Sequence, residues 1–234
     1  MCPAKSIQEL VEHQARWNWL RTALEERPVC PESGEHRWIT ISRQTGSGGS
    51  LLGQAIGERL GWRVFDREIV VEIARAMHRS EPLVATHDEH AAGPLDDYLS
   101  YLIVPGDPGQ TRFLEEMVTT IRAIIRAENA VIVGRGANWF LNPQCGLRLR
   151  IVAPFEQRVE LLASRFGVRR EEAVRKLRDL DAEQKAFIRQ SFGRDVDDPL
   201  GYDVVINLGT LSLESATGIV LAALERKFAP APAP

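Results

Sequence analysis

A glycine-rich segment between an apolar run and a helical pattern has residue types suited to binding an anion. The apolar run spans residues 38–42 and the helical pattern spans residues 51–60. The residues between them are Arg43, Gln44, Thr45, Gly46, Ser47, Gly48, Gly49 and Ser50. Glycines let successive backbone N–H groups turn inward without a Cβ clash, and a helix that begins there adds its positive end. We therefore predict that all eight residues bind phosphate oxygens.

The segment departs at two positions from G-x-x-x-x-G-K-S/T, the pattern of phosphate-binding loops. Gly48 and Ser50 fit the pattern, whereas Arg43 stands at the first glycine and Gly49 at the lysine that bridges the phosphates. We predict that Arg43 supplies the missing cation, because its long side chain starts at the entrance of the loop. Ser50 is predicted to contact a magnesium ion held by the nucleotide. If Arg43 is lost, a lysine at position 49 is expected to restore the charge in part.

Two other interpretations of the glycines stay open. Gly46 and Gly48 form G-x-G, and Asp66 lies about where the ribose-binding acid of a Rossmann-type dinucleotide-binding enzyme would sit. Against that interpretation, the third glycine would fall at Leu51, and Asp66 is followed at once by Arg67 and a helical pattern. The other interpretation is a glycine turn that serves only close helix packing.

Apolar runs rich in β-branched residues alternate with longer helical patterns after residue 37. The apolar runs span residues 38–42, 63–65, 130–133, 147–153 and 202–207. The helical patterns span residues 51–60, 67–77, 113–128, 155–166, 170–190 and 213–227. Such alternation is typical of βαβ units. We therefore predict an α/β fold in which helices flank a parallel sheet, with the ligand cleft at the ends of the strands.

The remaining segments indicate additions to one α/β domain over residues 38–228. Residues 1–37 read as an N-terminal helix and a linker, since Ser6 and Glu9 form a capping-box pattern. Residues 80–110 are rich in proline and are predicted to be a substrate-side insertion. Residues 166–199 are rich in arginine and are predicted to be a helical lid. Residues 229–234 alternate Ala and Pro and are predicted to be a disordered tail.

Composition narrows the classes of partner. The chain has 234 residues, 44% of them hydrophobic, which is enough for one sizeable core. Its net charge of -3 lacks the basic footprint of proteins that bind nucleic acid or anionic membranes, so we expect a small partner. The three cysteines are widely spaced, which argues against a disulfide framework or a zinc site. We found no signal-peptide pattern and no apolar run of membrane-spanning length, so we expect a cytoplasmic protein.

Several motifs, in their order along the chain, resemble those of the cytidylate kinase-like family. They are residues 41–49, Gly53, residues 60–61, 65–70, 131–137 and 151–154, then Arg158, Asp181 and residues 202–207. The resemblance extends from residue 38 to about residue 227 and implies a P-loop NTPase fold. It also implies a nucleoside monophosphate kinase-like phosphotransferase. Such an enzyme moves the γ-phosphoryl group of ATP, with magnesium, to a small acceptor such as CMP.

The resemblance also implies which residues contact the substrates. On the acceptor side they are Asp66, Arg67 and Arg135, and in the lid they are Arg178, Arg189 and Arg194, with Asp181 predicted to orient a lid arginine. Arg43 and Arg189 are the predicted catalytic residues, because phosphoryl transfer depends mainly on positioning and on neutralising phosphate charge. Arginine suits this task because its planar fork donates two hydrogen bonds to one phosphate. The alternative for the lid arginines is a solvated face of ion pairs.

Four positions depart from the family's pattern. The first is Ser50, which stands where the family often has an arginine. Gly136 stands where cytidylate kinases carry an aspartate that recognises the pyrimidine. Gln184 replaces a basic residue of the lid, and Phe187 replaces a tyrosine. These differences favour a second hypothesis, in which the chain is a nucleotide-binding regulatory protein, a pseudokinase that lacks transfer activity.

Overall fold

A computed structural model of the chain describes residues 36–66 and 108–229. It also describes five residues nearer the N-terminus, all in helical conformation: Ala15, Asn18, Trp19, Thr22 and Leu24. The rest of the predicted N-terminal extension and the predicted helix at residues 67–77 lie outside the described residues. So do most of the predicted insertion and residues 230–234 of the predicted tail. These expectations stay predictions.

The five predicted strands form one parallel sheet in the described part of the chain, in the order β2-β3-β1-β4-β5. The strands are β1 (Trp38–Arg43), β2 (Arg63–Phe65), β3 (Ala130–Val133), β4 (Gly146–Val152) and β5 (Val204–Asn207). β1 is central, and its Ile39 is in register with Val131 of β3 and Leu147 of β4. β-branched residues suit such strands because they pack well on a pleated surface buried on both faces.

The strand order places a crevice at the carboxyl end of β1. The chain leaves β1 toward β2 at one edge of the sheet and later returns to β3, which fills the place beside β1. The neighbours of β1 are therefore β3 and β4. A dinucleotide-binding Rossmann sheet has the order 3-2-1-4-5-6, in which β2 is the neighbour of β1. The observed order does not match that alternative.

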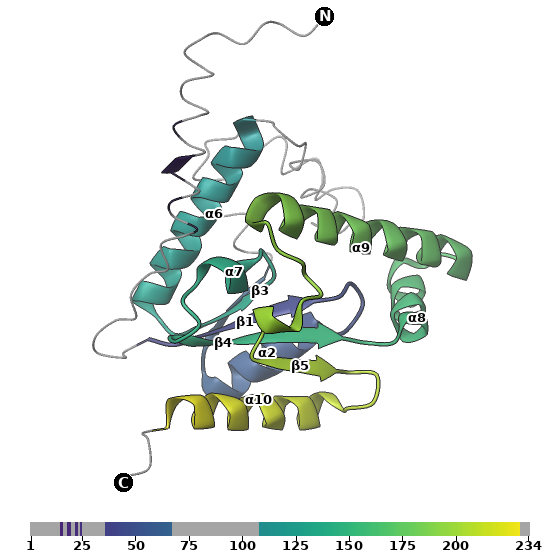
Figure 1. Ribbon diagram of the computed structural model, residues 1–234. Coiled ribbons are helices and arrows are strands. Elements are labelled where there is room, and N and C mark those ends of the chain that lie inside the picture. The colour runs from purple at the N-terminus through teal and green to yellow at the C-terminus, as the bar shows by residue number, and fades with distance from the viewer. Residues whose placement is uncertain are drawn as a thin grey trace, which may run out of the picture.

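Helices cover both faces of the sheet (Figure 1). They are α2 (Gly49–Leu60) and α10 (Leu213–Phe228) on one face, and α6 (Pro108–Ala127) and α7 (Ala137–Phe140) on the other. Ile39 and Ile41 belong to the core on the α2 and α10 side, whereas Trp38 belongs to the core on the α6 and α7 side. This division follows from the two-residue period of a strand, which points successive side chains to opposite faces.

A helical hairpin extends beyond the carboxyl end of β4 (Figure 1). It consists of α8 (Phe155–Phe166) and α9 (Arg170–Phe192), joined at Gly167, whose φ of 61° is in the left-handed region. Val159 and Leu177 are buried between the two helices. Near its other end, α9 packs Phe187 and Phe192 against the core on the α6 and α7 side. The hairpin contains most of the predicted lid.

The structure changes several predicted boundaries. α6 begins at Pro108, ahead of the predicted start at residue 113 and inside the predicted insertion. A proline is compatible with a first helical turn, because the N–H that it lacks would have no partner there. α9 continues past residue 190 to Phe192. β5 begins at Val204, two residues after the predicted start at residue 202. The preceding residues form an unpredicted 3₁₀ helix, Pro199–Gly201. The N–H of Tyr202 donates to the carbonyl of Pro199 in this helix and is therefore not available to the sheet. α7 and the 3₁₀ helix are too short to produce a recognisable period.

Two findings concern the expectations about the cysteines and about membrane-spanning segments. Cys145 is disulfide-bonded, which corrects the expectation that the cysteines form no disulfide. The other two cysteines, Cys2 and Cys30, lie outside the described residues. Spacing was a poor guide because disulfide formation depends on proximity in space. Across residues 36–66 and 108–229, no helix combines the length and the apolar character needed to cross a membrane.

The close packing of β1 against β4 gives a test of the core. Gly146 faces the ring of Trp38, which is 1% exposed, and a Cβ at position 146 would overlap that ring. We expect Gly146→Ala to lower the free energy of unfolding by about 1–3 kcal/mol through overpacking. The control is Gly218→Ala on α10, where an added Cβ meets no atom within 4 Å. This control should raise stability by about 0.5–1 kcal/mol, because alanine favours helix. Urea unfolding followed by circular dichroism measures both, and equal effects would contradict the packing argument.

Candidate functional site

The glycine loop between β1 and α2 presents backbone N–H groups at the start of a helix. Gly46 and Gly48 have φ of 76° and 82°, values that residues with a Cβ rarely adopt. Gly48 precedes the helix, and no side chain caps the helix at that position. The first intrahelical bond runs from the N–H of Leu52 to the carbonyl of Gly48, at 3.0 Å. The N–H groups of the residues between them therefore have no intrahelical acceptor and can donate to an anion.

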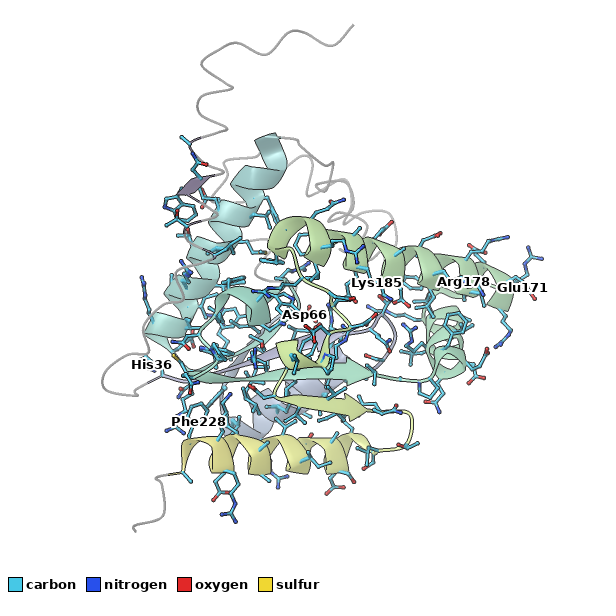
Figure 2. The ribbon with its side chains drawn as sticks, in the orientation of Figure 1. His36, Asp66, Glu171, Arg178, Lys185 and Phe228 are labelled. Carbon is cyan, nitrogen blue, oxygen red and sulfur yellow. The ribbon has the colours of Figure 1, made fainter. Side chains whose placement is uncertain are left out.

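The loop borders a cavity of about 690 Å³, a typical size for a ligand site. The walls consist of residues 42–51, Gln54, Asp66, residues 134–136, Leu161, Ser164 and Arg165 of α8, and Leu180, Glu183, Gln184, Phe187 and Ile188 of α9. All eight predicted phosphate-binding residues, together with Asp66 and Arg135, line this one cavity. Arg67 lies outside the described residues. In Figure 2, Asp66 lies between the sheet and α9.

Arg43 connects three parts of the cavity. Its Nε donates to Ser50 Oγ at 3.5 Å, and its Nη2 lies 3.6 Å from Asp66 Oδ1. A Cβ at Gly134 would approach Arg43 Nη1 to 2.9 Å, so the guanidinium also lies against the turn after β3. The side chain is 19% exposed. Arg43 thus places a cation between the loop and the ends of β2 and β3.

Gly49 cannot be replaced by lysine in this arrangement. A Cβ at position 49 would lie 2.5 Å from the Cβ of Arg43 and 3.3 Å from that of Ile151. An alanine at position 43 would keep the clashing Cβ. The expectation that a lysine at position 49 compensates for loss of Arg43 is therefore wrong, because the backbones of β1 and α2 approach too closely for any side chain there.

Arg135 has an unusual backbone conformation. It follows β3 and has φ of 60°, the only positive value for a residue other than glycine in the described part of the chain. Its neighbours Gly134 and Gly136 have φ of 82° and 64°. Such conformations cost about 1–3 kcal/mol for a residue with a Cβ and occur most often at functional sites. The turn holds the buried side chain of Arg135 beside the cavity.

One face of α9 forms a wall of the cavity, but its predicted arginines lie elsewhere. Gln184 Nε2 donates to the carbonyl of Arg43 at 2.9 Å, so the residue that replaces a basic position anchors α9 to the end of β1. Arg178 lies over the ring of Phe155, 5.8 Å from its centroid. Arg189 and Arg194 are exposed. None of these three arginines lines the cavity.

Asp181 has a different partner from the predicted one. It accepts two hydrogen bonds, at 3.0 and 2.9 Å, from Arg158 on α8, which lies outside the predicted lid. The Arg158 guanidinium also donates to the carbonyl of Thr45 in the loop, at 3.1 Å. The sequence motif contains Arg158, but the residue pattern alone predicts no role for this side chain. Its position one helical turn after Pro154 in the same motif was the available signal.

The comparisons with known proteins agree with this geometry. Residues 38–210 match the cytidylate kinase-like family. The chain belongs to that family. It is 33% identical to a cytidylate kinase of Pyrococcus horikoshii over 97 residues, 42% of this chain and 50% of that enzyme. It is 24% identical to a cytidylate kinase of Thermococcus kodakarensis over 192 residues, 80% of this chain and 87% of that enzyme. The match to the first enzyme thus spans half of its length.

A solved structure supports the fold. An uncharacterized protein from Eubacterium ventriosum shares 19% sequence identity with the chain and has a TM-score of 0.59, with 80% of this chain and 97% of that chain covered. Together with the family match and the five-stranded parallel sheet, this confirms the predicted α/β P-loop fold with flanking helices. The predicted lid and the predicted N-terminal helix stay predictions.

The structure gives a physical reason for the family departure at Gly136. A Cβ at position 136 would overlap the ring of Phe192. That ring is stacked on Phe140, with 6.1 Å between the centroids, and it meets Phe187 edge-on. An aspartate therefore does not fit between the turn and α9. With a side chain at position 136, α9 could not dock through these aromatic residues in the observed way.

A second buried arginine lies behind the loop. Arg150 of β4 donates to Ser42 Oγ at 2.9 Å and to Asp197 Oδ1 at 3.1 Å. Lys185 of α9 pairs with the same carboxylate at 2.7 Å. Burial tends to raise the pKa of Asp197, but the hydrogen bond and charge of Lys185, and then Arg150, hold it below the usual value. The hydrogen bond from Lys185 to Asp197 raises the pKa of Lys185. Sequence reasoning missed this network, although a basic residue in an apolar strand was a signal.

The network predicts a pH-dependent loss of stability in Asp197→Asn. A carboxylate whose pKa is lowered by folding stabilises the protein above its unfolded pKa of about 3.9, and this contribution is lost as pH falls through the lower folded pKa. Asp197 is 45% exposed and screened by solvent, so we expect a loss of about 1 kcal/mol at pH 7. The difference should be smaller at pH 3, which lies below that unfolded pKa. Urea unfolding of parent and variant at both pH values measures it, with Glu225→Gln on the exposed side of α10 as the control. A difference that is independent of pH would contradict the ion-pair explanation.

Proposed function

We propose that the chain is an ATP-dependent phosphotransferase of the nucleoside monophosphate kinase type, which moves the γ-phosphoryl group to a small acceptor. One observation carries this proposal: the amides of the glycine loop, Arg43 and Arg135 border a single cavity. Phosphoryl transfer needs this combination, because it depends on holding two phosphate-bearing groups in line and neutralising the charge on their oxygens.

The loop side of the cavity fits the phosphates of ATP. N–H groups at the start of α2 donate to phosphate oxygens, and the buried Ser47 hydroxyl, which has no hydrogen-bond partner among the described residues, adds a further donor. Arg43 replaces the lysine of the usual loop, in an orientation held by Asp66 and Ser50. It brings a planar, permanently charged group to the phosphates from the strand side.

Ser50 fits the role of a magnesium ligand. Its hydroxyl lies in the first turn of α2 and offers one oxygen, the element that magnesium prefers. The described residues contain no group of three or more His, Cys, Asp or Glu side chains suited to a metal, so the ion would be held mainly by phosphate oxygens and water. When bound, magnesium would offset part of the negative charge of the phosphates.

The acceptor side contains Arg135 and Asp66, to which the sequence adds Arg67. Arg135 suits a phosphate on the acceptor, and Asp66 suits a hydroxyl or the metal. The names of the relatives favour cytidine monophosphate as the acceptor. Because no side chain fits at Gly136, recognition of a base would have to involve other residues. For Arg189 to contact the transferred group, α9 must turn, since its side chain does not reach the cavity in the observed position.

The second candidate is a nucleotide-binding regulatory protein without transfer activity. It is favoured by the position of α9, whose arginines at 178 and 189 and the following Arg194 lie outside the cavity. The missing lysine at position 49 favours it as well. Both candidates share the nucleotide site and differ only in turnover.

Calorimetry and a kinase assay separate the candidates. We expect ATP with magnesium to bind, and a coupled assay across the common nucleoside monophosphates to show transfer to at least one of them. Binding of ATP without transfer to any monophosphate would favour the regulatory protein. Binding of NADH without binding of ATP would overturn both proposals.

Removal of Arg43 tests its role as the cation of the loop. We expect Arg43→Ala to weaken ATP binding and to lower turnover together, by about tenfold or more in affinity, because a hydrogen bond to a charged group is worth about 1.5–3 kcal/mol. Arg43→Lys keeps the charge but loses the fork, and should recover only part of the loss. The control is Arg175→Ala, an exposed arginine of α9 outside the cavity. An Arg43→Ala protein that binds and transfers like the parent would remove Arg43 from the mechanism.

Arg135 can be tested by separating binding from backbone strain. Arg135→Ala and Arg135→Gly both remove the guanidinium, so each should weaken monophosphate binding by about 1.5–3 kcal/mol. The glycine variant should be more stable than the alanine variant by about 1 kcal/mol, because φ of 60° suits glycine. Calorimetry and thermal melting measure the two effects. Unchanged affinity with a large fall in the melting temperature of both variants would show that Arg135 is structural.

A further inference from the structure

Arg158 holds the backbone of the glycine loop from outside the cavity. It lies in the first turns of α8, and its side chain is 5% exposed. Its guanidinium donates to the carbonyl of Thr45 at 3.1 Å and makes a two-point pair with Asp181. A Cβ at Gly46 would come within 3.0 Å of the Arg158 carbonyl and 3.3 Å of its Cβ. The Thr45–Gly46 peptide therefore rests directly on Arg158.

Because the peptide bond is planar, the hydrogen bond from Arg158 to the carbonyl of Thr45 also fixes the direction of the N–H of Gly46. In a trans peptide, the C=O and the next N–H point in opposite directions, and the described residues contain no cis peptide. Because the carbonyl of Thr45 points to Arg158, the N–H of Gly46 points away from Arg158. Gly46 lines the cavity and Arg158 does not. The contact thus directs the N–H of Gly46 toward the cavity.

Asp181 connects this contact to α9. Asp181 and Gln184 are three residues apart and so share a face of the helix. Through them, α9 holds two carbonyls of the loop, that of Thr45 by way of Arg158 and that of Arg43 directly, at 2.9 Å. If α9 moved away, the carbonyl of Arg43 would lose its donor, and Arg158, which belongs to α8, would lose the carboxylate that holds its guanidinium against the carbonyl of Thr45.

We propose that Arg158 and Asp181 are a positioning pair for the glycine loop, through which docking of α9 and phosphate binding favour one another. The inference rests on the proposed phosphate-binding role of the loop. Arg158 acts through the Thr45–Gly46 peptide, with Asp181 holding its guanidinium in place. Since coupling between two events is reciprocal, a bound phosphate chain also stabilises the docked position of α9.

Asp181→Asn tests the proposal by the sign of its effect. The variant removes a negative charge near an anion site, and electrostatics alone would tighten anion binding. The probe is inorganic tripolyphosphate, which carries no base and needs no acceptor, titrated by calorimetry. We expect binding about tenfold weaker or more, because the loop loses its orientation. The control is Asp179→Asn, the same change at an exposed position of α9, with affinity equal to or slightly above that of the parent. Equal or tighter binding by Asp181→Asn would overturn the proposal.

Arg158→Lys keeps the test valid if Asp181→Asn unfolds. Lysine retains the charge but lacks the fork that contacts Asp181 and Thr45 together, so tripolyphosphate binding should again weaken while circular dichroism shows a folded protein. Binding like that of the parent would mean that charge alone is needed, and would overturn the proposal. If the parent itself binds neither tripolyphosphate nor ATP, the proposed function fails. If the parent binds tripolyphosphate and both variants bind it with the same affinity as the parent, the proposed function stands and only the proposal of the positioning pair fails.

Discussion

The close approach of β1 and α2 at Gly49 determines how the site can be built. With 2.5 Å between the Arg43 Cβ and a Cβ at position 49, the first turn of α2 presses against the end of β1 and leaves no room for a side chain. The usual lysine is thereby excluded, and the loop amides lie close to the strand. Arg43, which leaves the strand at this point, places its guanidinium on the cavity side of the loop and is held there by Ser50 and Asp66.

The site also depends on α9, although α9 contributes little charge to the cavity. Gln184 and Asp181 attach it to the loop, and Phe192 attaches it to the turn at Gly136. Lys185 joins the network behind Ser42 through Asp197. The guanidinium groups of Arg150 and Arg158 can be buried here because carboxylate, carbonyl and hydroxyl oxygens accept hydrogen bonds from their Nη groups. Changes on α9 therefore alter the loop through backbone orientation as well as through direct contact.

Features that depend on local sequence could be predicted. The five strands were recognised from β-branched apolar runs, and the ends shifted by only a few residues because neighbouring turns compete for the same N–H groups. The glycine loop was recognised because glycines, a preceding strand and a following helix are contiguous. The prediction for the cysteines failed because pairing depends on distance in space, and the lysine replacement failed because packing between β1 and α2 is invisible in a motif.

The sequence by itself determined the fold class, the loop and the likeness to a kinase family, because short-range patterns and ordered motifs carry that information. Only the tertiary structure decided which buried arginines support the loop. The hydrogen bonds from Arg158 to Thr45, from Gln184 to Arg43 and from Arg150 to Ser42 join residues 113, 141 and 108 positions apart. No local pattern encodes such pairs, because they exist only when the order of the strands and the docking of α9 bring distant side chains to the same carbonyl or hydroxyl.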